Sequence, residues 1–294
     1  WLVMEAQVQL PPKLVPVFAH PRGELRYRGA YGGRGSAKSF SFAKMAAIWG
    51  YAEPLRILCT RDIQDSIKES FHAELKNAIA SEPWLAAAYD VGIDYLRGKN
   101  GTEFIFKGLR HNITSIKSMA QIDLCIIEEA EDVPEHAWEA LEPTIRAPKS
   151  EIWLIWNRKS VGSPVDNRFI KNEPPRSAIV ELNYRDNPWF PLELEEQRVH
   201  AQKTIDAGRY AWIWEGKYLQ DCEARVFRNW KVEEFDTPDD AIHRLGADWG
   251  FSIDPTVLIR CHIIGRKLYV DYEAYEIGCD IVRTPELFMS VPES

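Results

Sequence analysis

Residues 32–39 combine three glycines with a lysine and hydroxyl side chains in the order Gly-Gly-Arg-Gly-Ser-Ala-Lys-Ser. The order follows the pattern G-x-x-x-x-G-K-[ST], whose glycines let backbone N–H groups turn inward toward phosphate oxygens. Lys38 would place its ammonium on the β- and γ-phosphates of a nucleoside triphosphate, and Ser39 would offer a hydroxyl to Mg²⁺. Ala37 stands at the second glycine of the pattern, a departure that we expect to be tolerated if its backbone has helical φ. The alternative is a glycine turn that opens an ordinary helix.

A second candidate segment is an apolar run, residues 124–127, that ends in Glu128 and Glu129. Two neighbouring carboxylates raise each other's pKa, so a buried strand end that carries both is destabilising unless a cation lies there. We therefore expect Glu128 to hold Mg²⁺, directly or through water, and Glu129 to orient and deprotonate an attacking water. The alternative is a strand that runs into a solvated acidic helix start, since Glu131 and Asp132 follow.

The hydrophobic pattern around these segments predicts strands that alternate with helices. Strands are expected at residues 24–31, 55–60, 103–107, 124–127 and 151–156, and helices at 37–50, 62–80 and 135–146. This alternation predicts an α/β fold with a mainly parallel sheet that helices cover on both faces.

The pattern changes toward the end of the chain. Two helices, at about 191–207 and 208–219, precede the polar stretch at 236–240, and three strands with tight turns follow at 244–249, 256–264 and 267–275. Three such strands form a meander, not another strand–helix unit. We therefore predict a first domain at residues 1–219, a linker at 220–243 and a second domain at 244–294.

Composition limits the classes of protein that fit. The chain has 294 residues, a formal net charge of -8 and 45% hydrophobic residues, which suffices for a buried core. It has no run of 18 apolar residues, so no membrane span is expected. Its five cysteines are scattered and form no C-x-x-C pair, which argues against a disulfide framework or a zinc site built on cysteines. The acidic balance does not exclude a local basic face for nucleic acid, although basic groups are commonly solvated surface.

Beyond these patterns, the sequence resembles the large subunits of phage terminases of the PBSX-like type, from about residue 15 to its end. Arg34 within the phosphate loop, CIIEEAE at 125–131 and WLIWN at 153–157 resemble that family's phosphate loop, acidic strand and coupling motif. YRDNP at 184–188 and WEG at 214–216 resemble segments that follow the family's motor core. GADWGF at 246–251 resembles the first strand of its RNase H-like nuclease.

The resemblance implies a P-loop NTPase of the ASCE, RecA-like class, followed by the first strands of an RNase H-like domain. It implies ATP and Mg²⁺ as cofactors, with Mg²⁺ or Mn²⁺ at the nuclease site. The polypeptide would drive double-stranded DNA into a procapsid, in the cytoplasm of the infected bacterial host. Its partners would be the portal protein, the terminase small subunit and further copies of itself in a ring, with no membrane involved.

The resemblance also implies roles for individual residues. The expected nucleotide contacts are Gly32, Gly33, Arg34, Gly35, Ser36, Ala37, Lys38, Ser39 and Asn157, the last as a sensor of the γ-phosphate. The expected catalytic residues are Lys38, Glu129, Asp248 and an arginine finger, for which Arg34 is preferred over Arg61 and Arg158. The expected metal ligands are Ser39, Glu128 and Asp248. Because the family's later nuclease carboxylates would lie beyond Ser294, we expect the chain to be truncated within the nuclease and not to cut DNA.

Two other interpretations stay open. The chain could be a helicase-like or signalling P-loop NTPase, which DNA-stimulated ATP hydrolysis would distinguish from a packaging motor. It could also be an inactive prophage fragment, against which the intact Lys38, Glu128 and Glu129 argue.

Overall fold

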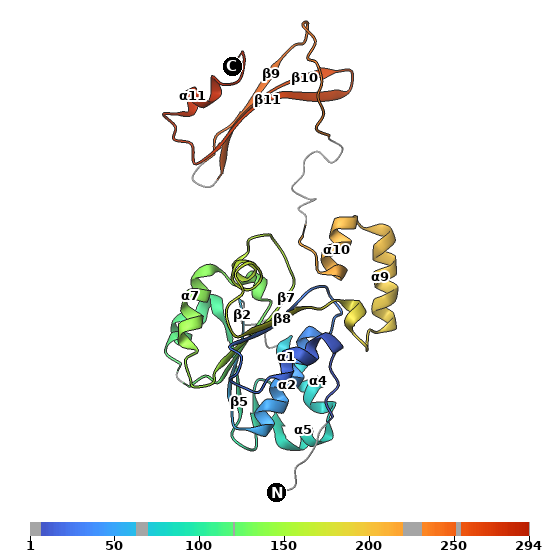
Figure 1. Ribbon diagram of the computed structural model, residues 1–294, viewed down its shortest axis with the longest axis vertical. Helices are drawn as coiled ribbons and strands as arrows, with labels where there is room; N and C mark the ends of the chain where they lie inside the picture. The colour runs from blue at the N-terminus through green and yellow to red at the C-terminus, as the bar shows by residue number, and fades with distance from the viewer. Residues whose placement is uncertain (1–6, 63–69, 120, 220–230, 251–253, 294) are drawn as a thin grey trace. The chain divides into compact units, whose positions relative to one another are not determined.

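The computed structural model describes residues 7–62, 70–119, 121–219, 231–250 and 254–293. The chain divides into two compact units, Trp1–Val226 and Phe227–Ser294. Each unit has a sheet of its own (Figure 1).

The first unit is built on an eight-stranded sheet in the order β3-β4-β5-β2-β6-β7-β1-β8. The strands are β1 (Tyr27–Tyr31), β2 (Arg56–Arg61), β3 (Tyr89–Val91), β4 (Leu96–Gly98), β5 (Glu103–Gly108), β6 (Leu124–Glu128), β7 (Glu151–Trp156) and β8 (Ser177–Glu181). All neighbours from β5 to β8 pair in parallel, whereas β3, β4 and β5 pair antiparallel. The predicted α/β fold with a mainly parallel sheet is therefore confirmed.

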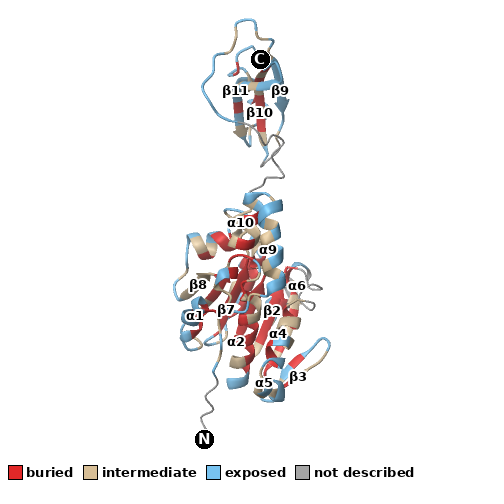
Figure 2. Cartoon of the chain, turned by 90° about the vertical axis from the view of Figure 1, so that its right-hand side faces the viewer, coloured by how far each residue is buried: buried red, intermediate tan, exposed pale blue. Residues whose placement is uncertain are grey.

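Helices cover both faces of this sheet, as the buried strands require (Figure 1). One face carries α1 (Val15–Ala19), α2 (Lys38–Ala52), α4 (Phe71–Ala80) and α5 (Pro83–Ala88); the other carries α6 (Leu109–Lys117), α7 (Glu135–Thr144), α8 (Pro164–Asp166) and the π turn η3 (Asn167–Lys171). Strand β7 shows why both faces are covered, because successive side chains point to opposite sides. Trp153 packs with the α2 side and Leu154 with the α7 side, so every residue of β7 is buried (Figure 2).

Several elements were not predicted from the sequence. Strand β8 was missed because none of its residues is fully buried, so its apolar signal is weak. The short elements α5, β3, β4, α6, α8 and η3 were missed as well. Of the helix predicted at 62–80, α4 accounts for residues 71–80, and residues 63–69 lie outside the described part of the chain.

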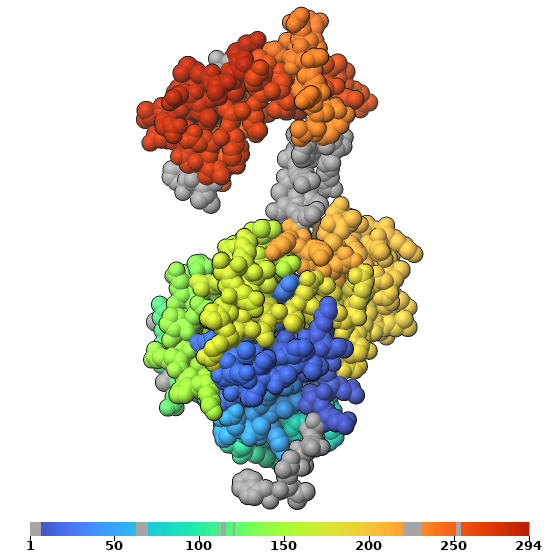
Figure 3. Space-filling model, viewed as in Figure 1, coloured from blue at the N-terminus to red at the C-terminus, as the bar shows by residue number. Residues whose placement is uncertain are grey.

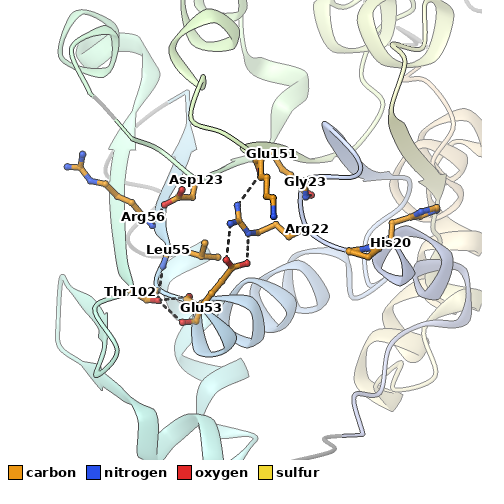
Figure 4. Close-up of polar contacts among 12 residues, drawn as sticks. His20, Arg22, Gly23, Glu53, Leu55, Arg56, Thr102, Asp123 and Glu151 are labelled. Carbon is orange, nitrogen blue, oxygen red and sulfur yellow. Dashed lines mark hydrogen bonds and ion pairs between the residues drawn. The ribbon is translucent and has the colours of Figure 1, made fainter. Parts of the chain in front are cut away.

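Ion pairs at the amino end of the sheet fix the N-terminal segment. The buried Glu151 carboxylate accepts from Arg28 Nε at 2.8 Å, from the Gly23 amide at 2.7 Å and from Trp153 Nε1 at 2.9 Å. Because these donors satisfy the buried charge, removing Arg28 would cost about 3–5 kcal/mol. Nearby, Arg22 Nη2 donates to Glu53 Oε2 at 2.9 Å, beside the start of β2 (Figure 4). This end of the sheet is structural, and the carboxyl ends of β1, β6 and β7 lie at the opposite edge.

The N-terminal segment also contacts the β8 side of the unit. Arg176 Nε, immediately before β8, donates to the Glu24 carbonyl oxygen at 2.9 Å. In the space-filling view, the dark-blue N-terminal residues lie against the yellow-green residues of this region (Figure 3). The N-terminal segment is therefore attached to the sheet beside β8, its last parallel strand.

After β8 the first unit continues into two helices, α9 (Leu192–Thr204) and α10 (Ala207–Glu215), which follow the 3₁₀ turn η4 (Tyr184–Asp186). Tyr184, Tyr210 and Trp214 form a small apolar cluster between them. Both helices were predicted, within a few residues of their observed bounds. No helix in the described part of the chain is long and apolar enough to cross a bilayer.

The second unit is a three-stranded antiparallel sheet with the order β11-β10-β9. The strands are β9 (Arg244–Asp248), β10 (Pro255–Ile264) and β11 (Lys267–Ile277), and a short helix, α11 (Thr284–Phe288), follows. Alternate residues of β10, from Thr256 to His262, are buried on one face. The three predicted strands are all present.

Candidate active site

The glycine-rich segment forms the turn between β1 and α2. The tightness of this turn follows from the backbone that packs against it. A Cβ at Gly32 would lie 2.1 Å from the Leu182 carbonyl oxygen, and one at Gly33 would lie 2.2 Å from the Trp214 carbonyl oxygen. Glycine at these two positions therefore lets the segment after β8 and the last turn of α10 reach the loop.

Hydrogen bonds hold the outer side of the loop in place. The Gly33 amide donates to Asn183 Oδ1 at 2.8 Å, and the Arg34 amide donates to the Ile213 carbonyl oxygen at 2.7 Å. Asn187 Nδ2 donates to the Gly35 carbonyl oxygen at 2.7 Å. The amides of Gly33 and Arg34 therefore already have acceptors within the protein. The first N–H groups of a helix lack intrahelical acceptors, so the start of α2 is suited to bind an anion.

Ala37 has a left-handed backbone, with φ of 61° and ψ of 21°. The condition under which we expected this departure to be tolerated, a helical φ, is therefore not met. The turn into α2 needs a positive φ at the residue before Lys38, which explains why the pattern has glycine there. An alanine in this conformation costs roughly 1–2 kcal/mol relative to a right-handed backbone.

Lys38 lies buried at the start of α2, with its ammonium inside the loop. Nζ is 3.1 Å from the Gly32 carbonyl oxygen, 2.8 Å from that of Gly33, 3.0 Å from Ser36 Oγ and 3.0 Å from Asn157 Oδ1. Burial lowers the pKa of Lys38 to about 7, and the nearby Glu131 carboxylate opposes that shift. The ammonium is therefore held by neutral oxygens in a site that disfavours its charge.

Asn157 reaches Lys38 because of the strand order. β7 lies between β1 and β6, so the residue that follows β7 stands between the phosphate loop and the acidic strand end. Its Oδ1 accepts a hydrogen bond from Lys38 Nζ. The loop from Gly33 to Ser39, Asn157 and the acidic residues line one cavity of about 740 Å³.

Glu128 and Glu129 face this cavity from the end of β6. Ser70 Oγ donates to Glu128 Oε2 at 2.7 Å, and Arg61 Nη1 lies 4.0 Å from the same oxygen. Burial raises the pKa of Glu128, and hydrogen bonds from Ser70 and Ser39 together with the Arg61 charge oppose it. Glu129 forms an ion pair with Arg61 Nη2. Arg61 therefore lies against both glutamates, and Ser70 contacts Glu128 as well.

The backbone turns sharply at Glu129, whose φ of 51° and ψ of 48° are left-handed. Such a conformation costs of order 1–3 kcal/mol for a residue other than glycine and persists only where the surroundings impose it. The turn ends the strand and leads into the 3₁₀ helix η2 (Ala130–Asp132), so that Glu131 also lines the cavity.

Glu131 is a site residue that the sequence did not reveal. Its Oε2 is buried without a hydrogen-bond partner, and burial raises the pKa of the carboxyl to about 8. A run of acids after a strand normally indicates solvated surface, so only the tertiary structure could place Glu131 beside Lys38. Burial thus shifts both groups toward their neutral forms.

The three arginine candidates have different environments. Arg34 is exposed and lines the cavity. Arg61, at the end of β2, forms an ion pair with Glu129 and lies 4.0 Å from Glu128 Oε2. Arg158 stacks on Tyr31 and Tyr218, with its Cζ 4.2 and 4.8 Å from the ring centroids. Arg34 is the one of the three that faces the cavity without such a structural contact in the described residues.

One side of the cavity is more apolar. Trp189, Pro191 and Leu194 line it beyond the phosphate loop, together with Phe40. Trp189 is 41% exposed, and its amide donates to Asn187 Oδ1 at 2.9 Å. No sequence pattern marked Trp189, because a single aromatic residue after a turn has no characteristic spacing.

Asp248 belongs to the second unit, unlike all the residues above. It is the last residue of β9, is exposed, and pairs with Val257 in the sheet. Within the described residues, no group of three potential metal ligands includes Asp248.

Comparisons with known proteins agree with this geometry. The chain is 23% identical to the PBSX phage terminase large subunit of Bacillus subtilis strain 168, over 90% of this chain and 67% of that protein. It is also 23% identical to the large terminase subunit of Bacillus phage SPP1, over 87% of this chain and 65% of that protein. A solved large terminase from a thermophilic bacteriophage superposes with a TM-score of 0.60 at 13% identity, covering 91% of this chain and 68% of that structure.

That structural similarity shows the fold, which is the P-loop NTPase class predicted from the loop and the alternating elements. A family model described as "Phage terminase large subunit" matches residues 24–217, about two thirds of the chain. The matched span contains the phosphate loop, both glutamates, Asn157 and the helices that pack against the loop. On this match, the chain belongs to the phage terminase large subunit family.

Proposed function

We propose that this chain is the ATP-hydrolysing motor part of a DNA-packaging terminase large subunit. The observation that carries the proposal is that Lys38, Asn157 and the glutamates at the end of β6 line the same cavity. Crystal structures of the thermophilic-phage large terminase in complex with ADP and with ATP-γ-S support nucleotide binding by this fold.

The triphosphate would lie at the start of α2. Its negative charge would draw Lys38 Nζ away from the Gly32 and Gly33 carbonyl oxygens, which compensate an ammonium only weakly. Phosphate oxygens within reach would also raise the lowered pKa of Lys38 and keep it charged. The buried ammonium is thus poised to gain more from a phosphate than it loses in the loop.

Ser39 and Glu128 fit a hard divalent cation. Both offer oxygen ligands, the preferred donors of Mg²⁺, and the hydrogen bond between them brings these oxygens together. Burial raises the pKa of Glu128, so a bound cation would stabilise its charged form. A bound Mg²⁺ would neutralise charge on the β- and γ-phosphates.

Glu129 is the proposed general base for the attacking water. Its ion pair with Arg61 holds the carboxylate in the lining of the cavity, where it would face a water that attacks the γ-phosphate. Arg34 is the proposed arginine finger because its exposed side chain can reach a phosphate in its own cavity or in that of a neighbouring copy.

Asn157, which directly follows β7, would couple ATP hydrolysis to the position of that strand. Its Oδ1 accepts from Lys38 Nζ at 3.0 Å, so movement of the ammonium onto a phosphate removes that partner. The amide side chain is then free to contact the γ-phosphate itself. Contact with Asn157 would therefore couple the presence of the γ-phosphate to β7.

The base of the nucleotide would lie on the apolar side of the cavity. Trp189 offers an exposed ring there, and stacking on an aromatic ring contributes about 1–3 kcal/mol per base. This side would favour a nucleoside triphosphate over free pyrophosphate.

The second unit is proposed to be part of an RNase H-like nuclease, with residues 1–219 as the motor domain, 220–243 as the linker and 244–294 as the nuclease part. Asp248 would be its first metal ligand and a catalytic residue, for Mg²⁺ or Mn²⁺. One carboxylate binds such a cation weakly, because the ion exchanges water only for several converging oxygens. We therefore expect no cleavage of plasmid DNA in Mn²⁺. Nicking that disappears in Asp248→Ala would show that expectation to be wrong.

The partners of the whole protein are proposals too, since the chain spans 67% and 65% of the two relatives. They are double-stranded DNA, the portal protein, the terminase small subunit and further copies of the chain in a ring. The proposed location is the cytoplasm of the infected host.

The test of this function is ATP hydrolysis with and without double-stranded DNA. We expect hydrolysis that DNA stimulates and that Lys38→Ala abolishes, with exposed Lys203→Ala as the matched control. Hydrolysis that ignores DNA would favour another P-loop NTPase. A well-folded sample without hydrolysis under either condition would favour an inactive fragment.

A further inference from the structure

Three potential metal ligands converge in the second unit. His243 immediately precedes β9, His262 lies near the end of β10, and Asp271 lies in β11. One ligand atom from each side chain lies within 4.8 Å of the others. We propose that these three residues bind one first-row transition-metal ion of the Zn²⁺ type.

Unpartnered imidazole nitrogens are the main support. His262 is 1% exposed, and neither of its ring nitrogens has a hydrogen-bond partner; the same is true of His243 Nε2. A buried polar atom without a partner costs about 1–3 kcal/mol. The rings of His243 and His262 lie side by side, with centroids 6.0 Å apart. One metal ion could bind a nitrogen of each ring.

The orientation of His243 suits a metal ligand. Its Nδ1 lies 2.7 Å from Glu293 Oε2, while its Nε2 lies 4.0 Å from Asp271 Oδ2. A carboxylate at Nδ1 favours the tautomer with the proton there, which leaves the lone pair on Nε2. Metal-binding histidines commonly have such a carboxylate on their second nitrogen. The ring of His262 is held by stacking on Tyr269, with centroids 5.3 Å apart.

A β-bulge brings Asp271 into the group. The pairing of β10 and β11 shifts between Arg260 and Cys261, whose partners are Tyr272 and Val270, so Asp271 is the extra residue. Bulges re-aim side chains, and this one places a nearly buried carboxylate beside two histidines.

The competing explanation is that Asp271 only balances Arg260. Arg260 Nη2 donates to Asp271 Oδ2 at 2.7 Å, and Thr237 Oγ1 donates to the same oxygen at 3.1 Å. These bonds satisfy Asp271 but leave the imidazole nitrogens without partners. A carboxylate accepts at about four lone-pair sites, so it can hold Arg260, Thr237 and a metal ion together.

The ligand set selects the ion and separates this site from Asp248. Two imidazoles with one carboxylate favour Zn²⁺, Co²⁺ or Ni²⁺, whereas Mg²⁺ prefers oxygen ligands. Three protein ligands leave a fourth position for water.

Asp248 ends β9, whereas His243 precedes its first residue, so the two lie at opposite ends of that strand. The ion would tie the start of β9 to β10 and β11.

The test is a Zn²⁺ titration of the full 294-residue chain, free of tags and nucleotide, against a chromophoric chelator. We expect one tight equivalent that millimolar Mg²⁺ does not displace. Co²⁺ at the same site should give the visible absorption of a four-coordinate ion. His243→Ala and His262→Ala should each weaken Zn²⁺ binding by at least about 10-fold, and Glu293→Gln, which removes the carboxylate behind His243, by roughly 10-fold.

Three controls decide where the ion binds. His200→Ala, an exposed histidine in α9, and Asp248→Asn should leave Zn²⁺ binding unchanged. Circular dichroism checks that each variant folds, and the part-exposed His243 covers the case in which the buried His262 is required for folding. Equal Zn²⁺ affinity in the wild-type chain and in folded His243→Ala would overturn the proposal. So would loss of the tight equivalent in Glu128→Gln, which would assign the ion to the nucleotide cavity.

Discussion

The two units of the chain treat their reactive residues in opposite ways. In the first, strands covered on both faces deliver Lys38, Asn157 and Glu128 to one cavity, where burial and defined partners shape their charges. In the second, β9 is exposed along its whole length, and Asp248 stands at its end with no cluster of ligands around it in the described residues. Three buried polar residues of that unit, Thr256, Arg260 and His262, lie instead on one face of β10.

This difference shows that a residue can match a sequence motif without lying in a formed site. Asp248 matches a family pattern, yet nothing in its described surroundings positions its carboxylate. Glu131 matches no expectation, yet burial raises its pKa to about 8 beside Lys38. Function should therefore follow burial and partners more closely than it follows sequence pattern.

The largest effect expected is on the proposed general base. Glu129→Gln keeps the shape of the side chain but removes its basicity, so ATP hydrolysis should fall by roughly 10²–10⁴-fold. Nucleotide affinity, measured by fluorescence titration, should change little. Asp248→Asn is the matched carboxylate-to-amide change in the other unit. If it reduced hydrolysis as much, the contrast between the units would be lost.

The next largest effect concerns the apolar side of the cavity. Trp189→Ala should weaken ATP binding by about 10-fold, since it removes the stacking surface for the base. Pyrophosphate binding should be unaffected, because the phosphate loop is untouched. Trp249→Ala changes an exposed tryptophan of the second unit and serves as the control. Equal losses in the two variants would rule out a specific role for Trp189.

The pKa of Lys38 predicts how nucleotide binding depends on pH. Because the free site has a lysine pKa of about 7, the ammonium is lost as the pH rises above 7, and binding a triphosphate must then restore it by proton uptake. ATP affinity should fall about fivefold from pH 7 to pH 8. Calorimetry in buffers of different ionisation enthalpy measures the uptake directly.

The control for this pH dependence is Lys38→Arg, which stays charged throughout the range. Its affinity should be lower overall but should not follow that titration. A parallel decline in both proteins would locate the titrating group elsewhere.

The smallest effect tests the left-handed alanine. Ala37→Gly should stabilise the first unit by about 1 kcal/mol, because glycine adopts positive φ without strain. For a unit of this size the thermal midpoint should rise by about 2–4 °C. Ala86→Gly, at an exposed position in α5, should have the opposite sign, since glycine disfavours a right-handed helix. A loss of stability in Ala37→Gly would mean that the loop favours the methyl group.

Much of the first unit follows from its sequence for a simple reason. Strands buried on both faces appear as unbroken apolar runs, of which β7 at 151–156 is the clearest, and glycines mark the turn before α2. The phosphate loop was found from its glycine and lysine pattern, and Glu128 and Glu129 from their place at the end of such a run. Asn157 came from the resemblance to the family's coupling motif. The half-buried β8 gave no comparable signal.

The remaining features depend on contacts between distant segments. The sequence could not show that Arg61 pairs with Glu129, or that the segment after β8 and helix α10 hold the phosphate loop. His243, His262 and Asp271 come from three segments at irregular spacing, so no metal-binding pattern includes them. Residue spacing reveals sites within one turn or strand, and packing creates the others.

The most direct test is a crystal structure of the chain with Mg²⁺ and a non-hydrolysable ATP analogue. The account predicts that Lys38 Nζ leaves the Gly32 and Gly33 carbonyl oxygens for the β- and γ-phosphates, with Mg²⁺ held near Ser39 and Glu128. An analogue bound outside this cavity, with Lys38 still on the loop carbonyls, would contradict it.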